Sequence, residues 1–227
     1  MARTPLSENV GLPFTAALRT CSVTVAGARV LSDVDFQIAS GEIFGIRGEN
    51  GSGKSTLLRV LAGLLIPDTG SAEVFGSSPT DASVRLRIGA AIDTPAFYGW
   101  MSGRGFLRTL IDMAGVRDDG RSQLALERFG LAGAGRKLTS RYSQGMKKRL
   151  ALAAASLHAP GLLLLDEPTN GLDPEGREVV RKWIERERDR GTAVVLVSHR
   201  DEDLAICELV FEMDAGKLSA AAKGGSG

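Results

Sequence analysis

The spacing of apolar and polar positions along the chain predicts alternating strands and helices. β-Branched runs at residues 21–25 and 34–38 flank Gly27 and polar turns, which indicates an antiparallel β layer between residues 16 and 38. Residues 42–46 predict a short strand. A glycine-rich loop separates it from apolar residues at helical spacing, which are Leu57, Leu58, Leu61, Leu64 and Leu65.

The middle of the chain has a different pattern. Residues 87–101 show no regular periodicity, and residues 103–157 predict helices that are interrupted by glycines. The continuous apolar run at 162–165 then predicts a strand that is buried on both faces, as in a parallel sheet. We therefore expect a helical lobe between two parts of a sheet domain.

A further helix and strand complete the pattern. Asp173 and Pro174 are typical of a helix start, and Gly191 of the position after a helix end. We expect the charged residues of this helix to face solvent, and its apolar stripe is Val179, Val180, Trp183 and Ile184. Residues 192–197 predict another buried strand, so the fold class is α/β.

Composition and charge narrow the possible functions. The 227 residues are 43% hydrophobic and 24% charged, which suits one large domain or two small lobes. Lys and Arg total 28 against 27 Asp and Glu, so the net charge of +1 gives no long-range attraction to nucleic acid. Cys21 and Cys207 lack metal-site spacing, and no apolar stretch approaches the roughly 20 residues of a membrane span. We expect a cytoplasmic chain with no nucleic-acid partner.

Residues 48–55 carry the strongest chemical signal in the chain. They match the phosphate-binding pattern G-x-x-x-x-G-K-[ST] between a predicted strand and a predicted helix. Glycines let the loop N–H groups approach phosphate, Lys54 neutralises the β- and γ-phosphate oxygens, and Ser55 is placed to hold Mg²⁺. We therefore expect ATP and Mg²⁺ to bind here. The expected nucleotide contacts are Gly48, Glu49, Asn50, Gly51, Ser52, Gly53, Lys54, Ser55 and Thr56.

Polar residues follow the two later strands. Asp166 and Glu167 end the apolar run at the carboxyl edge of the expected sheet, where ligands of open α/β folds bind. We expect Asp166 to orient Mg²⁺ and Glu167 to accept a proton from the attacking water or to direct it. His199 ends the next strand, where a neutral imidazole can contact the γ-phosphate, whereas His158 has only a structural interpretation.

Taken together, these motifs resemble the ATPase subunits of ABC transporters, and the resemblance covers about residues 18–218. Besides the phosphate loop and the Leu-Leu-Leu-Leu-Asp-Glu run, residues 142–149 (Tyr-Ser-Gln-Gly-Met-Lys-Lys-Arg) resemble the family's signature sequence. Residues 170–173 (Asn-Gly-Leu-Asp) resemble its D-loop, which here ends in Asp173. The order of the motifs makes this resemblance specific.

The resemblance implies a P-loop NTPase core lobe with an antiparallel β layer and an inserted helical lobe. We expect residues 16–218 to form a single ABC ATPase domain, with the helical lobe at about residues 94–158. Residues 1–15 are expected to be a loose N-terminal extension, and residues 219–227 a flexible C-terminal tail.

The resemblance also implies partners. In that family two subunits sandwich ATP head to tail, beneath a transmembrane permease on the inner face of the cell membrane. Ser143, with the backbone of Gln144 and Gly145, begins a helix whose N-terminus favours an anion, namely the γ-phosphate of a partner subunit's ATP. The partner can be a second copy or a related subunit. We expect the basic residues 147–149 to be a solvated helix face beside the nucleotide.

Three positions depart from the family pattern. Val25 stands where most members stack an aromatic ring on adenine, so recognition of the base is expected to be weaker. Gln144 replaces the second residue of the common S-G-G run but keeps its backbone N–H. Asp93 stands in place of the glutamine that links Mg²⁺ and water to the permease. A carboxylate there resembles exporters of the bacitracin and lantibiotic self-protection type.

Two questions stay open from the sequence. An export ATPase is the first hypothesis, and a soluble ABC-type ATPase, for example in iron–sulfur assembly, is the alternative. A nucleotide sensor without hydrolysis conflicts with the presence of Lys54, Asp166, Glu167 and His199 together. The segment 93–104 either docks a permease or packs the helical lobe onto the core, through Phe97, Tyr98, Trp100 and Met101.

Overall fold

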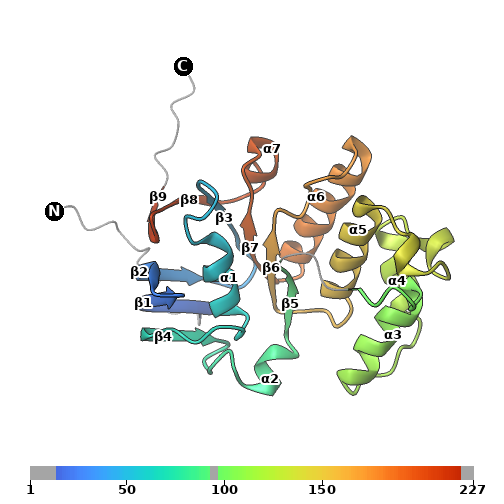
Figure 1. The fold of residues 1–227 in the computed structure, drawn as a ribbon, viewed down its shortest axis with the longest axis horizontal. Coiled ribbons are helices and arrows are strands. Elements are labelled where there is room, and N and C mark those ends of the chain that lie inside the picture. The colour runs from blue at the N-terminus through green and yellow to red at the C-terminus, as the bar shows by residue number, and fades with distance from the viewer. Residues whose placement is uncertain (1–13, 93–96, 221–227) are drawn as a thin grey trace.

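Two β-sheets form the framework of the chain in a computed structural model, which describes residues 14–92 and 97–220 (Figure 1). The larger sheet has the strand order β5-β6-β7-β3-β8-β9. Its first five strands are parallel, and β9 pairs antiparallel with β8. The strands are β3 (Ile43–Arg47), β5 (Ile88–Ala91), β6 (Leu162–Asp166), β7 (Ala193–Val197), β8 (Leu209–Asp214) and β9 (Lys217–Ala220).

The apolar run at 162–165 forms an interior strand, as predicted. Leu162 and Leu164 point into one hydrophobic core, and Leu163 and Leu165 point into another on the opposite face of the sheet. All four leucines are fully buried. This burial on both faces explains why the run has no polar alternation.

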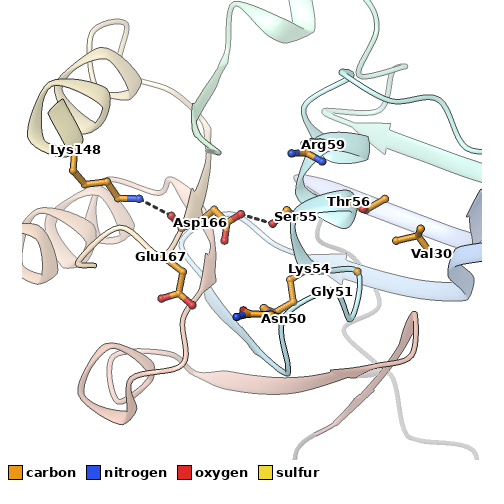
Figure 2. Close-up of a pocket in the computed structure, with 11 residues that line it drawn as sticks. Val30, Asn50, Gly51, Lys54, Ser55, Thr56, Arg59, Lys148, Asp166 and Glu167 are labelled. Atoms are coloured by element: carbon orange, nitrogen blue, oxygen red, sulfur yellow. Dashed lines mark hydrogen bonds between the residues drawn. The ribbon is translucent and has the colours of Figure 1, made fainter. Parts of the chain in front are cut away.

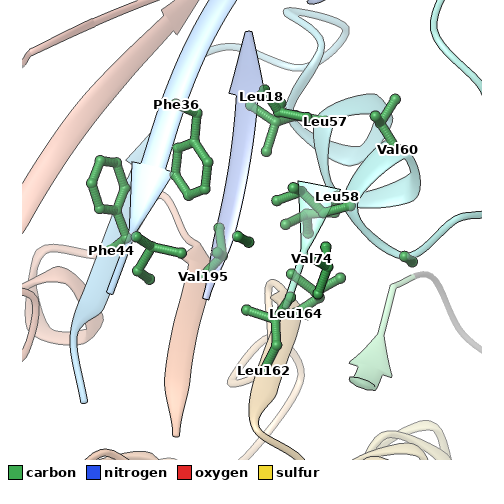
Figure 3. Packing of buried hydrophobic residues seen from close by; sticks show 14 of the residues in the cluster. Leu18, Phe36, Phe44, Leu57, Leu58, Val60, Val74, Leu162, Leu164 and Val195 are labelled. Carbon is green, nitrogen blue, oxygen red and sulfur yellow. The ribbon is translucent and has the colours of Figure 1, made fainter. Parts of the chain in front are cut away.

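The antiparallel layer is also present. Its strand order is β2-β1-β4, with β1 at Ala16–Val25, β2 at Ala28–Ile38 and β4 at Thr69–Val74. The first core lies between this layer, helix α1 (Lys54–Leu61) and the larger sheet. Figure 3 shows Leu57 and Leu58 of α1 among Leu18, Val74 and Leu164, which come from three different strands.

Helix α1 is shorter than its leucine spacing predicts. It ends at Leu61, and Gly63 has a φ of +67°, in the left-handed region. A Cβ on Gly63 would lie 2.1 Å from the carbonyl oxygen of Pro79, so the chain turns sharply here. Leu64 consequently points outward and is 65% exposed.

Most of the helices cover the face of the larger sheet that is opposite to α1 and the antiparallel layer. Three of them, α3 (Gly103–Met113), α4 (Arg121–Arg128) and α5 (Gln144–Ala155), occupy the stretch for which a helical lobe is expected. They lie beside α6 (Pro174–Asp189), away from the antiparallel layer (Figure 1). Short elements complete the chain: the helices α2 (Ala82–Arg85) and α7 (Asp201–Leu204), and the 3-10 turns η1 (Ala132–Ala134) and η2 (Thr139–Arg141).

Helix α6 begins and ends where the sequence predicts. The Asp173 side chain accepts a hydrogen bond from the Gly176 N–H, and Gly191 after the helix has a φ of +89°. The prediction that its charged residues face solvent is wrong at one position. Glu187 is only 5% exposed and accepts hydrogen bonds from Trp183 and Arg190, because α6 packs this side against α4.

Three further expectations need correction. Residues 88–91, within the stretch expected to be irregular, form the edge strand β5. Thr15, expected in a loose extension, is buried and donates its N–H to the Ile38 carbonyl. Ser219 and Ala220, expected in the tail, pair with β8. Within residues 14–92 and 97–220, no helix is long and apolar enough to span a membrane.

Candidate nucleotide-binding site

The phosphate loop connects β3 to α1, and its glycines serve two purposes. Gly48, Gly51 and Gly53 have φ values of 149°, 83° and 115°, in the region that favours glycine. A Cβ on Gly48 would lie 2.1 Å from the Met213 carbonyl oxygen, and one on Gly53 would lie 2.8 Å from that of Val30. Gly51 faces open space. The loop therefore needs glycine twice for close packing and at Gly51 for conformation.

Several hydrogen-bond donors of the loop and of α1 are suited to binding an anion. Lys54 donates its ammonium to the carbonyl oxygens of Gly48 (2.7 Å) and Glu49 (2.6 Å), which holds the loop closed around the side chain. Gly53 caps α1 without a side-chain acceptor, so the first-turn N–H groups have no acceptor within the helix. The buried Ser52 hydroxyl has no partner among the described residues. These features fit phosphate oxygens.

Ser55 and Asp166 bring two hard oxygen ligands together. The Ser55 hydroxyl donates to Oδ2 of Asp166 at 2.6 Å, which joins the start of α1 to the end of β6 (Figure 2). Oxygen donors of this kind suit Mg²⁺. Among the residues described, no group of three or more His, Cys, Asp or Glu side chains is arranged to hold a metal alone. The pair fits an ion that is also bound by phosphate. Asp93, the third expected ligand, lies outside the described residues.

Glu167 and His199 form a pair at the ends of β6 and β7. Nδ1 of His199 lies 2.8 Å from Oε1 of Glu167, and the Glu167 N–H donates to the Val197 carbonyl. Glu167 has a φ of +47°, a strained conformation for a residue with a side chain. Its other oxygen, Oε2, is buried without a hydrogen-bond partner among the described residues. That oxygen is thus available to a water molecule.

The pairing with Glu167 also constrains the chemistry of His199. A carboxylate only accepts hydrogen bonds, so Nδ1 carries the ring proton in this contact. A neutral ring then offers Nε2 as an acceptor, which cannot donate to a phosphate oxygen. The predicted contact of a neutral His199 with the γ-phosphate therefore requires the ring to leave Glu167 or to take a second proton.

Most of these groups line one cavity of about 580 Å³, but Gly48, Ser52 and His199 are not part of its lining. The lining residues are Val30, Asn50, Gly51, Gly53, Lys54, Ser55, Thr56, Arg59, Lys148, Asp166 and Glu167 (Figure 2). The lining includes Val30 but not Val25, whose side chain is 45% exposed. Val30 of β2 and Arg59, farther along α1 than the motif, were not expected from the sequence, whereas Lys148 belongs to the basic residues that were expected beside the nucleotide.

The signature residues lie elsewhere on the chain. Ser143 caps α5 by accepting a hydrogen bond from the Met146 N–H, and both Ser143 and Gln144 are exposed. Neither residue lines the cavity, and nor does Gly145, whose added Cβ would meet the Gly171 carbonyl at 3.3 Å. The described chain therefore keeps the start of α5 apart from its own phosphate loop.

Comparisons with known proteins agree with this arrangement. The family model described as "ABC transporter" matches residues 31–170, which is more than half of the chain. This chain belongs to the ABC transporter ATP-binding family. It is 38% identical to the daunorubicin resistance ATP-binding protein DrrA3 of Streptomyces coeruleorubidus, over 88% of this chain and 67% of that protein. It is 35% identical to the bacitracin transport ATP-binding protein BcrA of Enterococcus faecalis, over 83% and 63%.

A solved structure has the same fold. The ATP-binding cassette MJ0796, in a dimeric post-hydrolysis state bound to ADP and Pi, superposes with a TM-score of 0.82 at 22% identity, covering 90% of this chain and 96% of that one. At this identity the likeness establishes the fold alone. The chain spans about two thirds of the length of the first curated relatives it matches. What those longer proteins do is therefore a proposal for this ABC ATP-binding protein.

Two of the three basic residues after the signature, Lys148 and Arg149, have partners within the chain, which corrects the prediction of a solvated face at these two positions. Lys148 donates to the main-chain carbonyl of Asp166 at 2.8 Å (Figure 2), and Arg149 pairs with Asp173 at 2.6 Å. Both side chains are half-buried. In this ABC ATP-binding protein, α5 is thereby tied to both ends of the segment 166–173, which carries Glu167 and the D-loop.

The aromatic residues after position 96 separate into two groups. Phe97 packs edge-on against Phe106, with ring centroids 5.0 Å apart, and belongs to the core of the helices. Tyr98 and Trp100 are 61% and 74% exposed and lie against each other. Of the two interpretations of this segment, core packing holds for Phe97, and an exposed surface holds for Tyr98 and Trp100.

Proposed function

We propose that this chain binds and hydrolyses ATP with Mg²⁺, as one of a pair of subunits that power a separate membrane permease. The observation that carries the proposal is the single cavity lined by Lys54, Ser55, Asp166 and Glu167. These four side chains lie together at the carboxyl edge of one parallel sheet, and their chemistry supports the roles of a phosphate-binding cation, two metal-binding oxygens and a carboxylate base.

Each residue has a distinct task in this reaction. The loop N–H groups and Lys54 hold the phosphates, and Ser55 and Asp166 would hold Mg²⁺, which when bound would stabilise negative charge on the phosphate oxygens. Glu167 orients the attacking water through Oε2 and accepts its proton, while His199 holds the carboxylate from the other side.

Pairing follows from the position of the signature residues. The start of α5 is exposed at Ser143 and Gln144, carries the N–H groups of a helix N-terminus, and does not reach the cavity of its own chain. A γ-phosphate held by a second subunit supplies the anion that this helix end favours. ATP then joins the two subunits, and hydrolysis weakens the joint.

The permease partner and the direction of transport rest on different observations. The relatives DrrA3 and BcrA are named for daunorubicin resistance and bacitracin transport, which supports an exporter. Tyr98 and Trp100 present two exposed aromatic rings, and large aromatic residues are frequent anchors of protein interfaces. We place the chain at the inner face of the membrane, where it binds the permease through this pair.

Phosphate release from Mg-ATP by the purified chain tests the proposal. Lys54→Ala is expected to lose both nucleotide binding and hydrolysis. The matched control is Lys182→Ala, which removes an exposed lysine of α6 that pairs only with Glu178 among the contacts of the described chain. Hydrolysis by Lys54→Ala at the rate of the control would refute the proposed site.

A further inference from the structure

A buried polar cluster connects the segments that follow β6 and β7, and none of its side chains has a role in the function proposed above. At its centre is Asp203 of α7, which is only 1% exposed. Oδ2 of Asp203 accepts hydrogen bonds from the hydroxyls of Thr169 and of Ser198, the latter at 3.0 Å. Thr169 and Ser198 are themselves 1% and 0% exposed. Arg181 of α6 lies 3.4 Å from Oδ1.

Burial of a carboxylate carries a large free-energy cost. Its desolvation is costly unless hydrogen bonds and an opposite charge compensate, and apolar residues of similar size often serve stability equally well. Here the hydroxyls of Thr169 and Ser198 and the guanidinium of Arg181 provide that compensation. The use of Asp203 thus suggests a need for directed hydrogen bonds.

Those hydrogen bonds reach the two segments that carry the Glu167–His199 pair. Thr169 comes two residues after Glu167, and Ser198 directly precedes His199. The Ser198 hydroxyl also accepts a hydrogen bond from the Arg200 N–H, so this one side chain orients the backbone on both sides of His199.

The backbone conformation of Glu167 is a second, independent reason why this segment needs hydrogen bonds that hold it in place. Its φ of +47° is unfavourable for glutamate and persists only where the surrounding contacts enforce it. On one side the Glu167 N–H is held by Val197, and on the other its carbonyl accepts from the Asn170 N–H. The hydrogen bond from Thr169 to Asp203 fixes the chain between Glu167 and Asn170, and so helps to hold the backbone of Glu167.

We propose that Asp203 is a positioning residue, which holds the segments of Glu167 and His199 in register so that the two side chains meet. The proposal rests on the proposed ATP hydrolysis for its effect on rate. Its structural part, the alignment of His199 with Glu167, does not depend on that activity.

Turnover provides the first test. Asp203→Asn is expected to lower kcat by about 10- to 100-fold, the usual cost of a misplaced reacting group, with little change in KM for ATP. Thr169→Val and Ser198→Ala each remove one hydrogen bond and are expected to lower kcat less. Glu178→Gln is the control, since it removes the other carboxylate on Arg181 and leaves the cluster intact.

A double-mutant cycle separates positioning from general destabilisation. In the His199→Ala background, Asp203→Asn is expected to lower kcat by a smaller factor than in the wild type, because one member of the pair that it aligns is already missing. An unreduced effect of Asp203→Asn in that background would overturn the proposal.

Nuclear magnetic resonance of the histidine rings tests the structural part without any turnover. The chain has two histidines, so His158 serves as an internal reference. Ser198→Ala and Asp203→Asn are expected to shift the Nδ1 signal of His199 and to leave that of His158 in place. If the His199 signal stays unchanged in both variants, the inference is wrong, even if the wild-type chain hydrolyses ATP. If the signal shifts in a chain that hydrolyses no ATP, the inference stands and the proposed function fails.

Discussion

Nδ1 of His199 lies 2.8 Å from Oε1 of Glu167, so the segments that follow β7 and β6 are joined side chain to side chain. The contact uses the one ring nitrogen that carries a proton in a neutral histidine bound to a carboxylate. It leaves Oε2 of Glu167 for water. In this conformation His199 contacts the carboxylate that we propose as the base.

The first prediction concerns this pair. His199→Ala is expected to reduce ATP turnover by about 10²-fold while nucleotide binding stays close to that of the wild type, because Glu167 loses its orientation. His158→Gln, the change at the other histidine, is expected to leave turnover within about twofold. Steady-state kinetics and a nucleotide-binding titration on both variants measure this. Equal turnover of His199→Ala and the wild type would remove His199 from the site.

The second prediction concerns the exposed rings of Tyr98 and Trp100. Replacement of either by Ala is expected to leave folding and basal hydrolysis intact and to weaken binding to the permease by about 2 kcal/mol, near 30-fold. Leu64→Ala, which removes an exposed apolar side chain of the core lobe, is the control. Co-purification from detergent-solubilised membranes measures the binding. Variants that melt early and still co-purify would show that the rings pack the fold instead.

The third prediction concerns stability at the buried Glu187. This carboxylate accepts from Trp183 and Arg190 and lies 3.7 Å from Arg128 of α4. Glu187→Ala leaves these donors without their shared acceptor and is expected to lower the free energy of unfolding by about 3 kcal/mol. Asp189→Asn, at an exposed position of the same helix, is expected to cost no more than about 0.5 kcal/mol. Urea denaturation compares the two, and equal midpoints would contradict the assigned burial.

The fourth prediction concerns pH. Burial lowers the pKa of His158 below its ordinary 6.5, a hydrogen bond with the Ile88 carbonyl partly opposes this, and Arg121 adds to the lowering. The unfolded chain therefore binds a proton more readily than the folded one. The contribution of His158 to the free energy of unfolding is therefore fully present above pH 6.5. It is lost as the pH falls through the lower pKa of the folded state. Urea midpoints measured across this range should decline less in His158→Gln than in the wild type.

The sequence predicted those elements whose signal is local. The phosphate loop, the buried strands β6 and β7, and the caps of α6 each depend on a few neighbouring residues. Strand β5 (Ile-Gly-Ala-Ala) was missed because its small residues show no alternation, and they are suited to close packing, where a Cβ on Gly89 would meet the Ala155 carbonyl at 2.2 Å. Its place at the sheet edge is decided by contacts far away in the sequence.

The same distinction applies to the site. Lys54, Ser55, Asp166 and Glu167 belong to motifs with a definite spacing, and the fold brings them to one cavity. Lys148 was taken for a solvent-exposed residue, since its contact with the Asp166 carbonyl exists only when α5 packs beside β6. The partner of a charged side chain on a helix cannot be predicted from the local sequence when that partner lies far away along the chain.

The central claim is that ATP joins two of these subunits and that water, oriented and deprotonated by Glu167, then hydrolyses the γ-phosphate. Sedimentation of Glu167→Gln in Mg-ATP and in Mg-ADP tests it most directly, because this variant retains the phosphate loop while hydrolysis slows by about 10²- to 10⁴-fold. The account predicts that dimers accumulate with ATP and that the chain stays monomeric with ADP. Equal association in the two nucleotides would contradict it.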